Sequence, residues 1–106
     1  QALAEGMHFS EKAGLNTQEV IEVISRGAAQ SWQMDNRWES MLADYYEHGF
    51  AVDWMRKDLG FVLEESVVNG SNLEITNLID SFYDEVQQRG GGRWDTSSLF
   101  RRLNSQ

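Results

Sequence analysis

Residues 49–60 read Gly-Phe-Ala-Val-Asp-Trp-Met-Arg-Lys-Asp-Leu-Gly, which places a Lys-Asp-Leu-Gly tetrapeptide inside a helical pattern. With the period of an α-helix, one face of this segment holds the residues expected to point inward. They are Met55, Leu59, Val62, Leu63 and Ser66. Lys57 points away from that face, beside Phe61 and Glu64. The back of the helix is therefore either a solvated surface, which spacing alone favours, or a cation and an aromatic ring presented to another group.

The rest of the chain shows helical periodicity and no credible strand. Asn16, with Glu19 three residues later, predicts a capping box at the start of a short helix. Asp53 is expected to cap the helix that carries Lys57, and Asp95 predicts the cap of the last helix. Six helical segments are expected, at 1–13, 16–27, 29–43, 53–68, 76–88 and 95–103. The sequence predicts an all-α bundle of five or six helices that forms one domain over residues 1–106.

Composition restricts the classes of function. The chain has 106 residues, a formal net charge of −8 and no cysteine. The negative charge argues against nucleic-acid binding, and the absence of cysteine excludes disulfides and thiolate metal sites. There is no apolar run of membrane-spanning length, and we expect a cytoplasmic protein with no membrane partner.

Motifs for cofactor or metal binding are missing from the chain. No Gly-x-Gly-x-x-Gly fingerprint occurs, and Gly90–Gly92 has no preceding strand, so we interpret the triple glycine as a flexible hinge. His8 and His48 have no partners at metal-ligand spacing, so no metal site is predicted. Ser31 has no neighbouring base to activate it and is expected to cap the helix that follows.

Four segments in a fixed order resemble one enzyme family. They are the Lys-Asp-Leu-Gly segment after Gly-Phe, residues 11–15 (Glu-Lys-Ala-Gly-Leu), residues 19–24 (Glu-Val-Ile-Glu-Val-Ile), and residues 27–32 (Gly-Ala-Ala-Gln-Ser-Trp) followed by Asn36-Arg37. The order resembles the β-hydroxyacid dehydrogenases, which include 3-hydroxyisobutyrate dehydrogenase and the tartronate semialdehyde and glyoxylate reductases. The resemblance runs from Gln1 to about Leu103. It implies a helical C-terminal domain like that of 6-phosphogluconate dehydrogenase-type enzymes, truncated at its N-terminus and separated from its Rossmann domain.

The resemblance also implies roles for five residues. The lysine of the Lys-Asp-Leu motif, here Lys57, reaches toward the nicotinamide cofactor across the cleft between the domains. Asp58 and Phe50 would lie near the same cleft, and Ser31 and Trp32 would line its substrate side. Plain core packing is the alternative for Phe50 and Trp32.

The proton-transfer lysine of the family lies in a Gly-x-x-x-Lys-x-x-Asn pattern, which is expected upstream of Gln1. Lys12 does not stand in such a pattern. The resemblance therefore implies that the full-length enzyme uses NAD or NADP, and that this chain alone binds neither and is inactive.

Two functions follow from these observations. In the first, the chain is the C-terminal domain of an oxidoreductase that acts on a short 3-hydroxy acid or its semialdehyde, and it contributes to a homo-oligomer, since relatives dimerise through this domain. The alternative is a stand-alone helical interaction or dimerisation module, whose partner-contacting aromatic residues would be Trp38, Trp54, Phe61 and Trp94.

Overall fold

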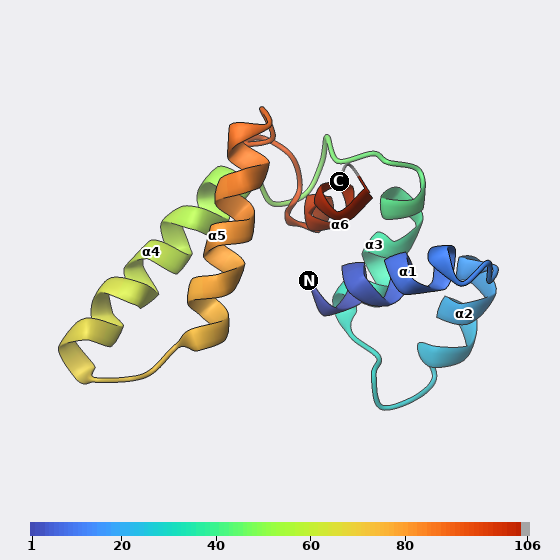
Figure 1. Cartoon of the computed structure of the whole chain (residues 1–106), viewed down its shortest axis with the longest axis horizontal. Helices are drawn as coiled ribbons and strands as arrows, with labels where there is room; N and C mark the ends of the chain where they lie inside the picture. Colours follow the sequence, from blue (N-terminus) through green and yellow to red (C-terminus); the bar gives the residue numbers. More distant parts are fainter. Residues whose placement is uncertain (105–106) are drawn as a thin grey trace.

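The computed structural model describes residues 1–104, in which helices are joined by turns and loops (Figure 1). The elements are α1 (Ala2–Lys12), α2 (Thr17–Ile24), α3 (Trp32–Leu42), α4 (Val52–Asn69), α5 (Glu74–Gln88), the 3₁₀ turn η1 (Thr96–Ser98) and α6 (Leu99–Asn104). The prediction of an all-α fold with five or six helices is confirmed, because the described residues contain six α-helices and no named strand.

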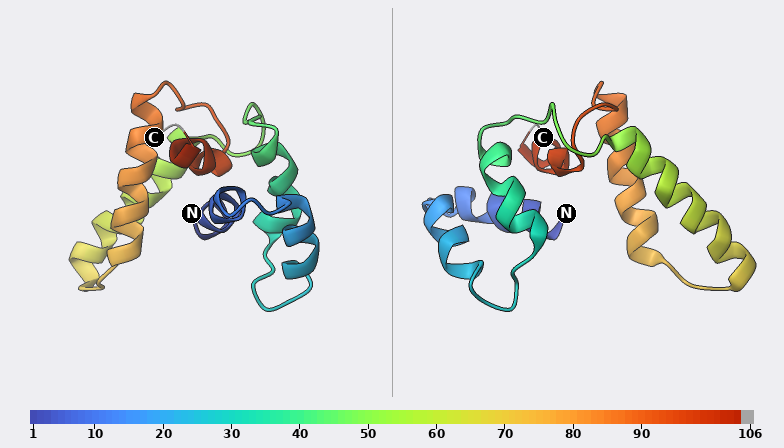
Figure 2. Two further views of the ribbon diagram at one scale, coloured as in Figure 1. Left: turned by 45° about the vertical axis from the view of Figure 1, so that its right-hand side comes forward. Right: turned by 180° about the vertical axis from the view of Figure 1, so that it is seen from behind.

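The helices are arranged as two arms rather than as one parallel bundle. Helices α4 and α5 form a long antiparallel hairpin, whereas α1, α2 and α3 pack together on the other side (Figures 1 and 2). Helix α6 lies between the arms and contacts both α1 and α5. The N-terminus lies in the gap between the two arms (Figure 2).

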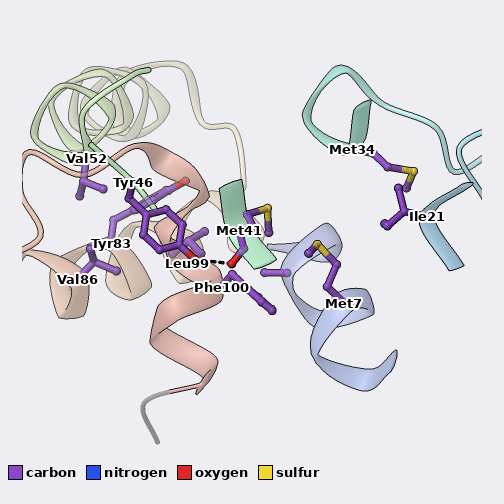
Figure 3. Packing of buried hydrophobic residues seen from close by; sticks show 11 residues of the cluster. Met7, Ile21, Met34, Met41, Tyr46, Val52, Tyr83, Val86, Leu99 and Phe100 are labelled. Atoms are coloured by element: carbon purple, nitrogen blue, oxygen red, sulfur yellow. Dashed lines mark hydrogen bonds between the residues drawn. The ribbon is translucent and has the colours of Figure 1, made fainter. Parts of the chain in front are cut away.

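The core sits where the arms meet. Met7 of α1, Met41 of α3 and Phe100 of α6 are buried there, and a second group of buried residues extends into the base of the hairpin (Figure 3). That group comprises Val52, Tyr83, Val86 and Leu99. The Tyr83 hydroxyl donates to the carbonyl oxygen of Thr96 at 3.0 Å, and burial raises its pKa to about 12. The core therefore fixes the bases of both arms.

Three predicted helix caps are confirmed. The side chains of Asn16 and Ser31 accept from the amides of Glu19 and Met34, each at 3.1 Å, and Asp95 accepts from the amide of Ser97 at 3.0 Å. Because Ser31 is the cap, α3 begins at Trp32 and not near residue 29.

The expected cap of α4 was wrong. Helix α4 begins after Ala51, so Asp53 lies in its first turn, where it accepts a hydrogen bond from the side-chain amide of Gln87 at 2.7 Å. A negative charge in the first turn still stabilises the helix through its interaction with the helix dipole. Asp53 therefore ties α4 to α5 instead of capping α4.

The triple glycine is not a flexible hinge but a packed turn. The amide of Asp53 donates to the carbonyl oxygen of Gly92 at 2.8 Å. A side chain at Gly91, which is buried, would collide with the Trp94 ring and with Val86. Glycine is needed here because two parts of the chain approach closely.

The α4–α5 hairpin has one ionic side. Nε of Arg56 donates to Asp80 at 3.0 Å, and its Nη1 donates to Asp84 at 2.8 Å.

The predicted apolar faces of α4 and α5 are only partly buried, since Val62 and Leu78 are about half exposed. The outer part of this arm therefore carries apolar side chains that the described residues leave uncovered.

Candidate functional site

The outward face of α4 carries Lys57 between two aromatic rings. The Lys57 Nζ lies 5.8 Å from the ring centre of Trp54 and 5.9 Å from that of Phe61. These spacings of three and four residues place the three side chains on one helical face, and such cation–π contacts hold an ammonium group over exposed rings. Asp58 lies beside Lys57 and is exposed. The cation is therefore positioned without being buried.

The loop before α4 is held by an antiparallel bridge between Ala51 and Asp95. The amide of Thr96 donates to the carbonyl oxygen of Phe50 at 2.9 Å, and the amide of Asp95 donates to that of Tyr46 at 2.8 Å. Gly49 has a φ of +72°, and a side chain there would collide with the Asp95 carboxylate. Only glycine fits both conditions without strain, which explains the Gly-Phe pair.

Asp95 organises this loop from a buried position. Its side chain is only 1% exposed. It accepts from the Phe50 amide at 2.9 Å, from Nε of Arg37 at 3.1 Å, and from both the amide and the hydroxyl of Ser97. Burial opposes its ionisation, but these hydrogen bonds and the charge of Arg37 outweigh burial and hold the pKa of Asp95 below its usual value. A carboxylate that is ionised at neutral pH thus anchors the Phe50 loop.

Arg37 connects the same carboxylate to the start of α3. Its guanidinium carbon lies 4.9 Å from the ring centre of Trp32, while its Nε reaches Asp95. Trp32 is 58% exposed and Phe50 is 44% exposed, so neither packs into the core of the described chain. The core-packing alternative for these two residues is therefore wrong within residues 1–104.

The predicted site residues divide into three groups. Phe50 and Trp54 line one hollow of about 290 Å³. Lys57 does not line this hollow, but its ammonium group contacts the ring of Trp54. Trp32 is linked to the Phe50 loop through Arg37 and Asp95. Ser31 caps α3 and lines a different cavity, of about 370 Å³, between α1, α2 and the start of α3.

Sequence reasoning missed the role of Arg37 and recognised Asp95 only as a helix cap. The two residues are 58 positions apart, so no local pattern connects them. A buried ionised carboxylate can be recognised only when its donors from distant segments are known.

Neither a cluster of metal-ligating side chains nor a membrane-spanning helix occurs in the part of the chain that the structure describes. No group of three or more histidine, aspartate or glutamate side chains there is arranged to hold a metal ion. Among those residues, no helix is both long and apolar enough to cross a lipid bilayer.

Only two of the four aromatic residues proposed as contacts of a stand-alone interaction module are exposed enough to meet a partner. Trp38 and Trp94 are partly buried and pack against the core. Trp54 and Phe61 are about half exposed, and they share their face with Lys57. The two exposed rings therefore lie on the same face of α4 as Lys57.

A family model described as the NAD-binding domain of NADP-dependent 3-hydroxyisobutyrate dehydrogenase matches residues 1–103. The chain is 60% identical over 103 residues to an uncharacterized oxidoreductase of Shewanella frigidimarina, a match that covers 97% of this chain and 35% of that protein. It is 34% identical over 99 residues to an uncharacterized oxidoreductase of Bacillus subtilis, covering 93% of this chain and 34% of the relative.

A solved structure has the same fold. The crystal structure of a 3-hydroxyisobutyrate dehydrogenase from Salmonella typhimurium matches with a TM-score of 0.85 and 26% sequence identity, over 94% of this chain and 35% of that chain. This chain spans about a third of the length of the curated relatives that it matches.

Proposed function

Because the chain belongs to the family of NAD-binding domains of NADP-dependent 3-hydroxyisobutyrate dehydrogenases, we propose that it is the C-terminal helical domain of an NAD(P)-dependent oxidoreductase. The substrate of the full enzyme would be a short 3-hydroxy acid or its semialdehyde, as the name of the similar Salmonella protein suggests. The resemblance found from the sequence is thereby confirmed at the level of the family. A cytoplasmic location and a homo-oligomeric state stay predictions.

One observation carries the proposal. Lys57 projects from α4 on the same exposed face as two aromatic rings, and within residues 1–104 it forms no ion pair. Most of the arginines are neutralised by carboxylates, as Arg37 and Arg56 are. An uncompensated cation beside exposed rings suits an anionic ligand that carries flat aromatic groups, and a nicotinamide dinucleotide is such a ligand.

The residues of this chain would bind and orient the cofactor rather than react. Lys57 would donate to it, with Asp58 beside Lys57. Phe50 and Trp32 would form apolar walls that exclude water from the cleft, and Ser31 is the weakest of the five candidates because it lines another cavity. The nicotinamide ring of the bound cofactor supplies or accepts the hydride.

We further propose that the chain needs its Rossmann domain for activity. The Gly-x-x-x-Lys-x-x-Asn pattern that the family uses for proton transfer does not occur in residues 1–106, and no dinucleotide fingerprint does either. The isolated chain should therefore show no NAD(P)H-linked activity and no micromolar affinity for NADH or NADPH.

A chimera tests the proposed function. In it, this chain replaces the matched third of the Shewanella frigidimarina oxidoreductase, a substitution between sequences that are 60% identical. The folded chimera should reduce NAD or NADP with 3-hydroxyisobutyrate or a related short 3-hydroxy acid, as the unaltered Shewanella protein should. A chimera that melts cooperatively but has no activity, beside an active Shewanella protein, would overturn the proposal. Micromolar binding of NADPH by the isolated chain would overturn the proposed division between the two domains.

A further inference from the structure

The turn between α4 and α5 carries an Asn-Gly pair at the outer end of the hairpin, away from the other helices (Figure 1). Asn69 is the asparagine of this chain that a glycine follows. The asparagines that precede residues with side chains are Asn16, Asn36, Asn72, Asn77 and Asn104. Because glycine has no side chain to shield its amide or restrict its backbone, the nitrogen of Gly70 can approach the side chain of Asn69.

The side chain of Asn69 has one polar atom bound and the other free. Its Oδ1 accepts from the backbone amide of Ser71 at 2.9 Å. A donor at this position stabilises the negative charge that develops on the oxygen when a nucleophile adds to Cγ. Within residues 1–104, Nδ2 of Asn69 forms no hydrogen bond, whereas Nδ2 of Asn77 donates to the carbonyl oxygen of Leu73 at 3.1 Å. The nitrogen of Asn69 can therefore leave without breaking a contact.

The end of α4 is held by few contacts at this point. Gly70, with a φ of +79°, ends the helix in the left-handed conformation, and its amide donates to the carbonyl oxygen of Ser66 at 2.9 Å. That bond breaks before the Gly70 nitrogen reaches Cγ of Asn69. Val68 is 80% exposed, and nothing lies within 4 Å of the position that a side chain at Gly70 would take. A helix end with so few packed neighbours opens at low cost in free energy.

We propose that Asn69 is a site of spontaneous deamidation through a succinimide. The backbone nitrogen of Gly70 gives up its proton and bonds to Cγ of Asn69, the bond from Cγ to Nδ2 breaks, and the side-chain nitrogen leaves as ammonia. Water then opens the ring. Addition of water at Cγ gives an aspartate at position 69, whereas addition at the backbone carbonyl carbon gives an isoaspartate. One water enters and one ammonia leaves, so no oxidant, cofactor or second enzyme is needed.

Either product changes the outer end of the hairpin. It adds a negative charge beside Val67 and Val68, which are both exposed, in a chain whose net charge is already −8. An isoaspartate also lengthens the main chain by one carbon, so the amide of Gly70 loses its alignment with the carbonyl of Ser66. The site lies about 18 Å along α4 from Lys57, as the rise of an α-helix gives. This inference therefore does not rest on the proposed function.

Incubation of the whole chain at mildly alkaline pH tests the proposal, because the attacking nitrogen has to lose its proton. Peptide mapping by mass spectrometry follows each asparagine, and an isoaspartyl methyltransferase assay detects isoaspartate. Asn69 should react at least about ten-fold faster than Asn72, which is exposed in the same turn but precedes Leu73. Equal rates at the two asparagines would overturn the proposal. Aspartate formed without isoaspartate would indicate direct hydrolysis and would overturn the succinimide route.

Gly70→Ala separates the chemistry from the opening of the helix. Backbone strain at a positive φ favours opening, but the added side chain hinders ring closure, so Asn69 should react at least about five-fold more slowly than in the wild type. Gly14→Ala is the matched control, because Gly14 also has a positive φ and open space around it, and it should leave the rate at Asn69 unchanged. An unchanged rate in Gly70→Ala would overturn the proposal. The comparison of Asn69 with Asn72 needs no variant, so it decides the outcome even if Gly70→Ala does not fold.

Discussion

Nε of Arg37 lies 3.1 Å from Oδ2 of Asp95, although the two residues are 58 positions apart in the chain. This contact joins α3, which begins at Trp32, to the loop that carries Phe50. The arrangement of the candidate site therefore depends on one buried carboxylate, that of Asp95.

Replacing that carboxylate should destabilise the fold. Asp95→Asn leaves Arg37 and the amides of Phe50 and Ser97 with weakened acceptors, so we expect a loss of roughly 3 kcal/mol in the free energy of unfolding, as for other broken buried ion pairs. Urea denaturation measures it. Asp44→Asn is the matched control, because Asp44 pairs with Arg101 at an exposed surface and such pairs contribute less than about 1 kcal/mol. Equal losses for both variants would mean that Asp95 has no special role.

The stability of the chain should depend on pH through the same residue. The pKa of Asp95 is lowered in the folded state, so its carboxylate stabilises the fold fully above the unfolded value of about 4. That stabilisation is lost as the pH falls through the lower folded-state pKa. The difference between the wild type and Asp95→Asn should therefore be constant near neutral pH and shrink below about pH 4. A difference that grew on acidification would contradict the assignment.

Gly49 should tolerate substitution far less than Gly70. Both glycines have positive φ, at +72° and +79°. A side chain at Gly49 would collide with Asp95 and Arg37, whereas nothing lies within 4 Å of the same position at Gly70. Gly70→Ala should cost about 1 kcal/mol from backbone strain alone. Gly49→Ala should cost clearly more in the same thermal or urea melts, and equal costs would show that the loop adapts without loss.

What the sequence predicted correctly depends on short-range physics. Asn16, Ser31 and Asp95 cap helices through acceptors two or three residues from their donors, a spacing that can be read directly from the sequence. The outward position of Lys57 follows from helical period in the same way. These features need no knowledge of the tertiary structure.

The errors concern contacts between distant segments. The packing of Gly91 against Trp94 and Val86, the bond from Gln87 to Asp53, and the Arg37–Asp95 pair all join parts of the chain whose distance is set by the tertiary fold. A glycine run reads as flexible when its neighbours are unknown, and an acidic residue before a helix reads as a cap. The arrangement of the helices as two arms could not be predicted either, because periodicity identifies the inward face of a helix and not the element that covers it.

The isolated chain should self-associate through the α4–α5 hairpin. Val62, Ile75 and Leu78 are exposed on this arm, and exposed apolar patches favour association. Light scattering over a range of concentrations should give a mass that rises to at least a dimer. The double variant Ile75→Glu/Leu78→Glu should remain monomeric, whereas Val23→Glu, at an exposed valine of α2, should behave as the wild type. A monomeric wild type at all concentrations would contradict the prediction.

Lys57 should matter for the cofactor and not for folding. It is exposed, so in the chimera Lys57→Ala should change the free energy of unfolding by less than about 0.5 kcal/mol. Loss of a charge-assisted contact to the cofactor should cost about 1–3 kcal/mol in binding, which is measured as a raised KM for NAD or NADP. Lys57→Arg should recover only part of this, because the planar guanidinium does not replace a point charge. Lys12→Ala, at another exposed lysine, should leave both quantities unchanged. A wild-type KM and kcat in Lys57→Ala, at an unchanged Tm, would mean that Lys57 is an ordinary solvated lysine.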